Sequence, residues 1–181
     1  MNTAPPTHGI SIRRLDVVTS REFAGLCELL IDCVEGGASV SFMQPITMSK
    51  AAEFWREVAG SALRGERALV VAEDAQGKIL GTAQAVWPAA ENQPHRADVA
   101  KMLVLRSARG QGVGAAVLAA IEQAARDAGK TLLVLDTASA AAERLYERGG
   151  WQRVGTIPKY ALMPDGPFCS TVFYYKDLTV R

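Results

Sequence analysis

A glycine-rich segment between an apolar run and a long helical pattern contains the residues of this chain whose types and spacing could do chemistry. Residues 99–105 are mostly apolar, and Arg109-Gly-Gln-Gly-Val-Gly114 opens the helical pattern. A helix N-terminus exposes unpaired backbone N–H groups and about half a positive charge. Glycines there let a phosphate approach the backbone without a Cβ in the way. The segment therefore predicts a binding site for a pyrophosphate.

Two well-known phosphate-binding patterns fit this segment poorly. The P-loop ends in Gly-Lys-Ser/Thr, and no lysine or hydroxyl follows Gly114. The strict dinucleotide pattern G-x-G-x-x-G also fails, although its looser form ending in alanine is met by Gly110, Gly112 and Ala115. Asp136 ends the next apolar run at about the right distance for a ribose-binding acid. A nicotinamide or flavin site therefore stays open as an alternative.

A third pattern, Arg/Gln-x-x-Gly-x-Gly/Ala, is matched in full by Arg109, Gly112 and Gly114. On these residues the segment resembles the acyl-CoA pyrophosphate loop of the GNAT superfamily of N-acetyltransferases. The resemblance implies that acetyl-CoA binds here as the acyl donor. The residues it assigns to the cofactor are Arg109, Gly110, Gln111, Gly112, Val113, Gly114 and Ala115. A plain helix cap is the alternative interpretation, but a cap needs one glycine rather than three.

The resemblance also implies contacts from the strand that precedes the loop. In this family that strand bulges, and its backbone donors meet the acyl and pantetheine groups, which here assigns Met102, Leu103 and Val104. Backbone N–H groups directed at a developing oxyanion stabilise the transition state of acyl transfer. The side chains of these three residues are expected to be ordinary core residues.

A tyrosine stands where the family carries the acid that protonates the leaving thiol. Tyr146 is preceded by Leu145 and followed by Gly150-Trp151, which continues the family pattern. A phenol with a pKa of about 10 can serve as a donor to a thiolate. The family often has asparagine seven residues earlier, where this chain has Ser139. Ser139 is therefore a candidate cofactor contact or, alternatively, the N-cap of a helix, and core packing is the alternative for the tyrosine.

Two aspartates are candidates for the base that takes a proton from the attacking amine. An alkylammonium with a pKa of about 10 must lose a proton before it attacks. Asp136 ends a predicted central strand, where ligands of open α/β sheets bind, and Asp98 lies on the strand that carries the backbone donors. A salt-bridged or capping aspartate is the alternative for each. Direct transfer is expected, because no Cys/His arrangement for a covalent intermediate is evident.

Several segments outside the loop look like one branch of the superfamily, the tabtoxin-resistance acetyltransferases. They are Glu35-Gly-Gly-Ala-Ser-Val-Ser-Phe-Met43, Arg96-Ala-Asp98, Leu135-Asp-Thr137, Pro158-x-Tyr160 and Pro164-Asp-Gly166. Enzymes of that branch acetylate a small amino-acid-like β-lactam toxin. The resemblance implies a small-molecule primary amine as acceptor, in a site walled by Ser39, Phe42, Tyr160 and Asp165. For the two aromatic residues of this set, anchoring of loops on the core is the alternative.

Composition and charge bound the class of protein. The chain has 181 residues, 49% hydrophobic and 22% charged, which is typical of a globular protein with one well-buried core. A net charge of +1 gives no electrostatic reason to expect nucleic acid or an anionic membrane as partner. Residues 1–8 indicate a disordered lead-in without a signal peptide, and residues 9–181 a single acetyltransferase domain. Three cysteines without metal-ligand spacing indicate reduced thiols, a cytoplasmic protein and no metal.

Hydrophobic periodicity predicts an α/β (α+β) chain in the order β-α-α-β-β-β-α-β-α-β-β. We expect one central mixed, mostly antiparallel sheet of six to seven strands, flanked by about four helices. The predicted strands are 10–18, 68–73, 78–87, 96–105, 131–136, 151–156 and 171–177. The first two helices are expected to be capped by Thr19 and Ser49, the third follows the glycine-rich loop, and the fourth covers 140–148. Residues 157–170 are expected to form a loop with a turn at Pro164-Asp-Gly166.

This order resembles the GNAT fold from about residue 9 to residue 178. A dinucleotide domain would need further parallel βα units after Asp136, and only one short helix and two strands follow. A non-catalytic acyl-CoA-binding module stays open as well, although it could dispense with Tyr146 and the aspartates. The edge strands and the apolar segment 171–175 could pair between subunits, which predicts a homodimer.

Overall fold

The computed structural model describes residues 9–180, so the expectation for residues 1–8 lies outside the described part of the chain. One seven-stranded sheet has the order β1-β2-β3-β4-β5-β7-β6. Its strands are β1 (Ser11–Arg14), β2 (Arg67–Glu73), β3 (Ile79–Val86), β4 (Arg96–Val104), β5 (Leu132–Thr137), β6 (Gln152–Leu162) and β7 (Phe168–Asp177). Neighbouring strands run antiparallel except β4 and β5, which run parallel. The predicted mixed, mostly antiparallel sheet is confirmed.

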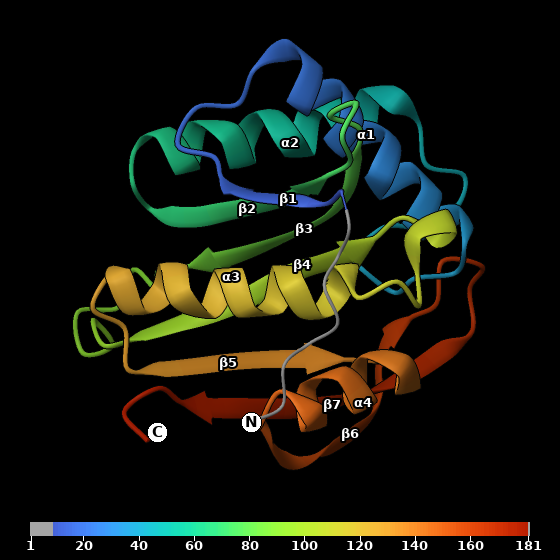
Figure 1. Cartoon of the computed structure of the whole chain (residues 1–181). Coiled ribbons are helices and arrows are strands. Elements are labelled where there is room, and N and C mark those ends of the chain that lie inside the picture. Colours follow the sequence, from blue (N-terminus) through green and yellow to red (C-terminus); the bar gives the residue numbers. More distant parts are fainter. Residues whose placement is uncertain (1–8, 181) are drawn as a thin grey trace.

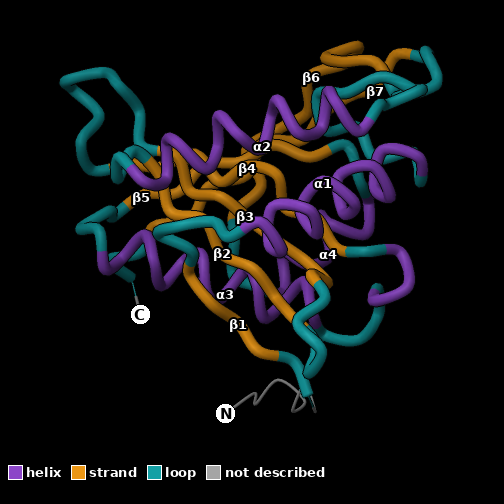
Figure 2. Tube along the Cα trace, turned by 90° about the horizontal axis from the view of Figure 1, so that it is seen from above, coloured by secondary structure: helices purple, strands orange, loops and turns teal. Residues whose placement is uncertain are grey.

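Helices cover both faces of the sheet (Figures 1 and 2). On one face lie α1 (Ser20–Glu35) and α2 (Met48–Leu63), and on the other lie α3 (Val113–Asp127) and α4 (Ala140–Arg148). A short 3₁₀ turn, η1 (Arg106–Ala108), leads from β4 into the loop before α3. Within residues 9–180, no helix is long and apolar enough to cross a membrane.

β2 is apolar without interruption from Ala68 to Ala72 because each face of the sheet has its own core. In β2, Val70 packs in the cluster beneath α3, whereas Leu69 and Val71 pack in the cluster beneath α1 and α2. All three side chains are at most 1% exposed. Alternate side chains of a strand point to opposite faces, so a strand buried on both sides needs a continuous apolar run.

Side-chain caps set the starts of α1 and α2. Thr19 and Glu22 form the predicted capping box of α1: the Thr19 N–H donates to the Glu22 carboxylate at 2.8 Å, and the Glu22 N–H donates to the Thr19 hydroxyl. The prediction that Ser49 caps α2 is wrong. Thr47 is extended and its hydroxyl accepts from Lys50 N at 3.2 Å, so Ser49 already lies inside the helix.

The last two strands are longer than predicted. β6 continues to Leu162 and β7 begins at Phe168, where these two residues pair, so the expected loop 157–170 shrinks to a turn over 163–167. A register shift between Ile157 and Ala161, with Lys159 at a φ of 52°, breaks the alternation that marks a strand. By contrast, β1 is shorter than predicted and covers only Ser11–Arg14 of the predicted strand 10–18.

β6, rather than the segment 171–175, forms the edge of the sheet. Residues 172–175 lie in β7, which pairs with β5 on one side and with β6 on the other. The segment 171–175 is therefore not free to pair between subunits, and that part of the dimer expectation is wrong. β6 lies at this edge of the sheet instead, and β1 lies at the other edge.

The sheet divides between β4 and β5 (Figure 1). Their pairing covers only residues 96–98 with 132–134. Beyond that point β4 follows β3 to Val104, whereas β5 follows β7 to Thr137. β4 also bulges there, because three residue steps from Ala100 to Leu103 face two steps from Gln84 to Thr82. Within the described residues, the second half of β4 thus has one edge without a strand partner. The functional residues predicted from sequence gather around this division.

Candidate active site

The N-terminus of α3 has the features of an anion site. Its N-cap, Gly112, makes no side-chain cap bond, and the first turn contains no acidic residue. Gly110 and Gly112 have φ of 75° and 83°, a left-handed region that favours glycine. Gly114 has another role: a Cβ there would lie 3.3 Å from Leu145 Cδ2, so its absence lets α4 pack close to α3. The unpaired N–H groups and the helix dipole suit a pyrophosphate.

Side chains around this helix start hold the loop in place. Arg109 Nε donates to the carbonyl of Val104 at 3.3 Å, which ties the loop to the end of β4. Gln111 Nε2 donates to the carbonyl of Ser107 at 2.9 Å. Val113 is 1% exposed and belongs to the core, so only its backbone is available to a ligand. Ala115 is exposed in the first turn of α3.

The edge of β4 presents backbone donors to the division in the sheet. Leu105 N donates to Leu80 O at 2.9 Å, so this N–H faces β3. Successive N–H groups of a strand point to opposite edges, so those of Met102 and Val104 face the division and that of Leu103 faces β3. The carbonyl of Val104 accepts from Arg109 and from the Cys33 thiol, outside the β3 ladder, which agrees with this alternation.

Tyr146 lies on α4 in the core between the helix and the sheet. It is 4% exposed, and its ring centroid lies 5.7 Å from that of Trp151 and 5.9 Å from that of Tyr174. Burial, and secondarily the nearby Asp136 carboxylate, raise the pKa of Tyr146 well above its ordinary value. The phenol is therefore neutral at physiological pH. Ser139 caps α4, with its hydroxyl accepting from Ala142 N at 3.4 Å, as the alternative interpretation expected.

The two candidate bases have different surroundings. Asp136 is exposed at the end of β5, and its Oδ2 accepts a hydrogen bond from Thr171 Oγ1 at 2.7 Å. Asp98 is the last residue of β4 that pairs with β5, and its Oδ1 accepts from Arg96 Nη1 at 2.5 Å. Asp136 thus stands next to the division of the sheet and forms no ion pair within residues 9–180, whereas Asp98 is ion-paired with Arg96. Their catalytic roles stay predictions.

A residue missed at the sequence level lies beside them. Lys101 occupies the β4 bulge with a φ of 50°. Its Nζ donates to Ser41 Oγ at 3.1 Å and lies 5.5 Å from the centroid of the Phe54 ring. Burial lowers the pKa of Lys101, and the charge of Asp136 partly opposes this shift. The signal in the sequence was a single charge inside the otherwise apolar run 99–105.

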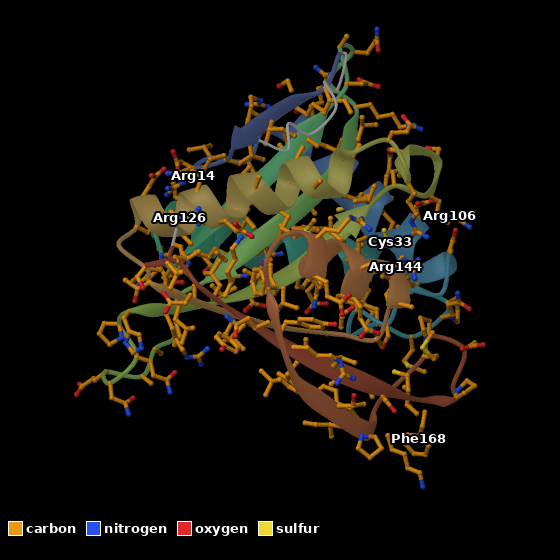
Figure 3. All side chains as sticks on the ribbon, turned by 60° about the horizontal axis from the view of Figure 1, so that its bottom comes forward. Arg14, Cys33, Arg106, Arg126, Arg144 and Phe168 are labelled. Carbon is orange, nitrogen blue, oxygen red and sulfur yellow. The ribbon has the colours of Figure 1, made fainter. Side chains whose placement is uncertain are left out.

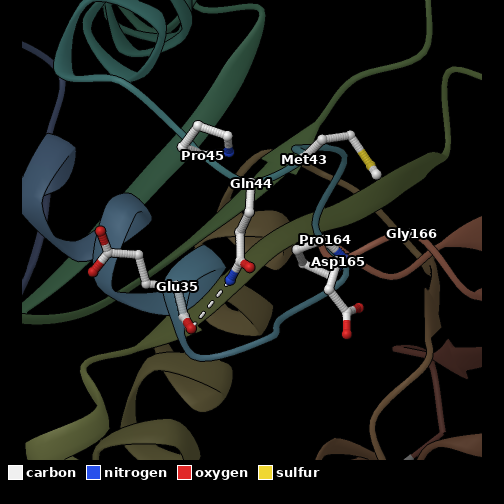
Figure 4. Close-up of a pocket in the computed structure, with 7 residues that line it drawn as sticks. All are labelled: Glu35, Met43, Gln44, Pro45, Pro164, Asp165 and Gly166. Atoms are coloured by element: carbon white, nitrogen blue, oxygen red, sulfur yellow. Dashed lines mark hydrogen bonds between the residues drawn. The ribbon is translucent and has the colours of Figure 1, made fainter.

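The loop between α1 and α2 is fastened to the β6–β7 turn. Ser39 Oγ donates to Leu162 O at 3.1 Å, and Gln44 N donates to Pro164 O at 2.9 Å. Where they meet, the surface is hollowed into an open pocket (Figure 4). The pocket is lined by Glu35, Met43, Gln44, Pro45, Pro164, Asp165 and Gly166.

Of the four predicted acceptor-wall residues, only Asp165 lines this pocket. The Ser39 hydroxyl bonds to the β6–β7 hairpin, and Phe42 packs on Phe54 with ring centroids 5.3 Å apart. Tyr160 packs on Phe173 at 5.7 Å and is 49% exposed. The structure therefore gives Ser39 and both aromatic residues packing partners, and their contact with an acceptor stays a prediction.

The β6–β7 hairpin carries several large apolar side chains that are exposed. Phe168 points outward from it in Figure 3 and is 69% exposed. The other large apolar side chains exposed on this hairpin are Val154, Ile157, Tyr160 and Leu162. Among residues 9–180, no cluster of three or more His, Cys, Asp or Glu is placed to hold a metal ion.

Comparison with known proteins gives consistent matches. Residues 64–153 match the family model described as an acetyltransferase (GNAT) domain. An uncharacterized N-acetyltransferase in the hisH–hisA intergenic region of Azospirillum brasilense is 30% identical over 129 residues, which are 70% of this chain and 74% of that protein.

Solved structures share the fold at lower identity. A phosphinothricin acetyltransferase from Sinorhizobium meliloti in complex with acetyl-CoA aligns with a TM-score of 0.78 and 18% identity, over 94% of this chain and 89% of that one. A ribosomal-protein-alanine N-acetyltransferase from Brucella melitensis aligns with a TM-score of 0.77 and 22% identity, over 93% and 99%. Likeness at these identities concerns the arrangement of the chain and leaves the acceptor open.

Proposed function

The chain belongs to the GNAT family of acetyltransferases, and we propose that it transfers the acetyl group of acetyl-CoA directly to a primary amine of a small molecule. The observation that carries the proposal is the uncapped, glycine-rich N-terminus of α3 beside the unpaired edge of β4. The first feature suits a pyrophosphate, and the second suits an extended, amide-bearing chain with a carbonyl at its end. Acetyl-CoA has both parts in one molecule.

We assign the donor to the α3 side of the division. Backbone N–H groups of residues 110–115 would hold the pyrophosphate, with Arg109 adding a positive charge. Pantetheine would follow the free edge of β4, where the N–H groups of Met102 and Val104 are available to its amides and to the thioester carbonyl. Such donors cost no reorganisation when negative charge develops on that oxygen, and they favour the tetrahedral intermediate.

We assign proton transfer to Asp136 and Tyr146. The acceptor ammonium first loses one proton, through Asp136, to solvent. The free amine attacks the thioester carbon, the N–C bond forms, and the C–S bond then breaks. The nitrogen loses its second proton. The departing sulfur gains a proton from the Tyr146 phenol, and the phenol is then reprotonated. The balance is one ammonium and one thioester converted to one amide, one thiol and one released proton.

The raised pKa of Tyr146 decides how it acts in this scheme. A phenol that holds its proton tightly stabilises a thiolate mainly by hydrogen bonding, and gives up the proton only as it receives another. A neutral donor in a water-poor position is worth more than the same group in water, because no solvent competes for the sulfur.

The acceptor is expected to be amino-acid-like, since the segments quoted for the tabtoxin-resistance branch cover both sides of the division. The buried thiols of Cys27 and Cys33 fit a reducing compartment, and a cytoplasmic location stays a prediction.

We also expect a homodimer formed through the exposed apolar hairpin of β6 and β7. Sedimentation at micromolar concentration should show it, and Phe168→Asp should shift it toward monomer; monomer alone in the unmodified protein would refute it.

A thiol-release assay over a panel of small primary amines tests the proposed reaction. We expect CoA release that depends on an amine, together with an N-acetylated product in equal amount. Without amine, the protein should gain no acetyl group by mass spectrometry, because transfer is direct. CoA release without amine product, or a stable acetyl-protein that transfers onward, would contradict the mechanism.

A further inference from the structure

We propose that Lys101 binds a carboxylate of the acceptor, so that the preferred substrates are amino acids or similar zwitterions with the carboxylate close to the reacting amine. The inference rests on the proposed function and adds the chemical class of its substrate. It is carried by the position of Lys101 relative to Asp136, and by the neutral partners of its ammonium group.

The register of the sheet places Lys101 and Asp136 across the division from each other. The last β4–β5 pair is Asp98 with Val134. Two residues further along each parallel strand are Ala100 and Asp136, and Lys101 follows directly. A cation on one strand and a carboxylate on the next thus stand at the same level, where the strands separate.

Both side chains also lie on the same face of the sheet. Leu133 and Leu135 pack in the core beneath α3, so Asp136 points to the opposite face, as alternate strand residues do. Lys101 reaches Ser41 of the α1–α2 loop and Phe54 of α2, which cover that opposite face. An acceptor entering from this side meets a negative and a positive group together, while the donor loop and Tyr146 lie on the α3 side.

Within residues 9–180, the ammonium of Lys101 forms no ion pair with a carboxylate, and the groups it contacts are a hydroxyl and an aromatic face. A partly buried cation with neutral partners is costly, and an anionic ligand relieves that cost. Asp136 Oδ2 accepts from the Thr171 hydroxyl rather than from Lys101, so the ammonium of Lys101 is available to a carboxylate from outside.

The backbone at Lys101 is bent so that its side chain reaches this place. A φ of 50° is unfavourable for a residue with a Cβ, and such conformations persist where the surroundings hold them. A bulge redirects a side chain relative to its strand. Here it takes a lysine out of the alternation of β4 and brings it against the α1–α2 loop.

Pairs of acceptors that differ only in the carboxylate test the inference. The kcat/KM of the unmodified protein for an amino acid should exceed that for the matching amino-acid amide by about tenfold or more, as for a charge-assisted hydrogen bond. This comparison needs no variant. In Lys101→Met the acid-to-amide ratio should fall to about one, chiefly through a higher KM for the acid, and Lys101→Arg should restore part of it.

Lys130 offers a matched control, because its Nζ lies 5.1 Å from the Trp87 ring centroid and donates to Pro94 O at 2.7 Å, at the other end of β5. Lys130→Met should leave the ratio unchanged. Equal activity of the unmodified protein on acid and amide overturns the inference, and so does an unchanged ratio in a folded Lys101→Met. Transfer to no amine at all overturns the proposed function, whereas transfer that ignores the carboxylate overturns only the role of Lys101.

Discussion

Replacing Tyr146 by phenylalanine removes one oxygen atom, which lies within the electrostatic influence of Asp136, and leaves the ring in place. The ring is 4% exposed and packs between Trp151 and Tyr174, contacts that phenylalanine keeps. Within residues 9–180, the phenol has no hydrogen-bond partner from the protein. We therefore expect Tyr146→Phe to change the free energy of unfolding by less than about 1 kcal/mol.

The expected effect on turnover is much larger. A positioned proton donor contributes about 10²–10⁴-fold, and the lower end of that range corresponds to about 2.7 kcal/mol of barrier. Thiol release with a saturating amine should fall at least about 100-fold in kcat. Affinity for CoA, measured by titration calorimetry, should stay the same, because the loop before α3 is untouched.

Tyr174→Phe is the matched control. Tyr174 is fully buried, and its hydroxyl shares its one proton between Glu143 Oε2 and Glu147 Oε1, each at 3.1 Å. Losing these bonds should cost about 1 kcal/mol and lower the melting temperature by roughly 2–4 °C, while turnover is kept. The two variants thus have opposite expected outcomes. Unchanged kcat in Tyr146→Phe would refute its role as donor, and lost CoA binding would mean that the hydroxyl positions the cofactor instead.

Three further changes test other parts of the account. Gly112→Val should lower the free energy of unfolding by about 1–2 kcal/mol, because Gly112 has a φ of 83°, and should weaken CoA binding by about tenfold or more. Gly155→Val, at a glycine without positive φ, is its control. Unchanged CoA affinity in Gly112→Val would refute CoA binding at this helix start. Asp136→Asn should lower kcat/KM at neutral pH by about 100-fold, and a larger loss in Asp98→Asn would transfer the role of base to Asp98. Burial raises the pKa of Glu22, but the Thr19 N–H and Arg13 more than offset this and leave it lowered. The stability that ionised Glu22 contributes to the folded protein is therefore complete above the unfolded-state pKa of about 4.3, and it is lost as pH falls through the pKa of Glu22 in the folded state. Denaturant unfolding should show that Glu22→Gln loses less stability on acidification than the unmodified protein does. Glu28→Gln is the control, and equal losses of stability in Glu22→Gln and the unmodified protein would contradict this prediction.

The parts of the fold that the sequence predicted are those set by neighbouring residues. The capping box of α1 lies within four residues, and the glycines before α3 act on the helix start directly. Both could be identified without knowing what packs around them. The ion pair of Asp98 with Arg96 belongs to the same class, because residues two apart on a strand share a face.

The features that were missed depend on distant partners. The second half of β6 forms because β7 pairs with it across a bulge, and Pro158 is tolerated on an edge strand. Thr47 and Ser49 are both suitable caps by residue type, and the structure shows that Thr47 is the residue whose hydroxyl accepts from Lys50 N. Lys101 acquires its position only when the α1–α2 loop and α2 close over β4, which no local pattern contains.

The division of the sheet was likewise beyond local patterns. The pattern of β4 and β5 predicts two apolar strands, and their separation after three paired residues results from the β4 bulge and from the pairing of β5 with β7. The family resemblance supplied the bulge as an expectation. The structure adds which groups of β4 face the opening, namely the N–H groups of Met102 and Val104 and the side chain of Lys101.

Thermal unfolding with and without ligand tests the central claim, the binding of acetyl-CoA at the α3 N-terminus. At about 100 times the dissociation constant, a ligand that binds only the folded state stabilises it by about 2.7 kcal/mol. For a chain of this size that corresponds to a rise in melting temperature of roughly 5–10 °C. We expect this rise with acetyl-CoA and with CoA, a smaller rise in Gly112→Val, and no rise with NAD. A rise with NAD alone, or none with either form of CoA, would refute acetyl-CoA binding at this helix start.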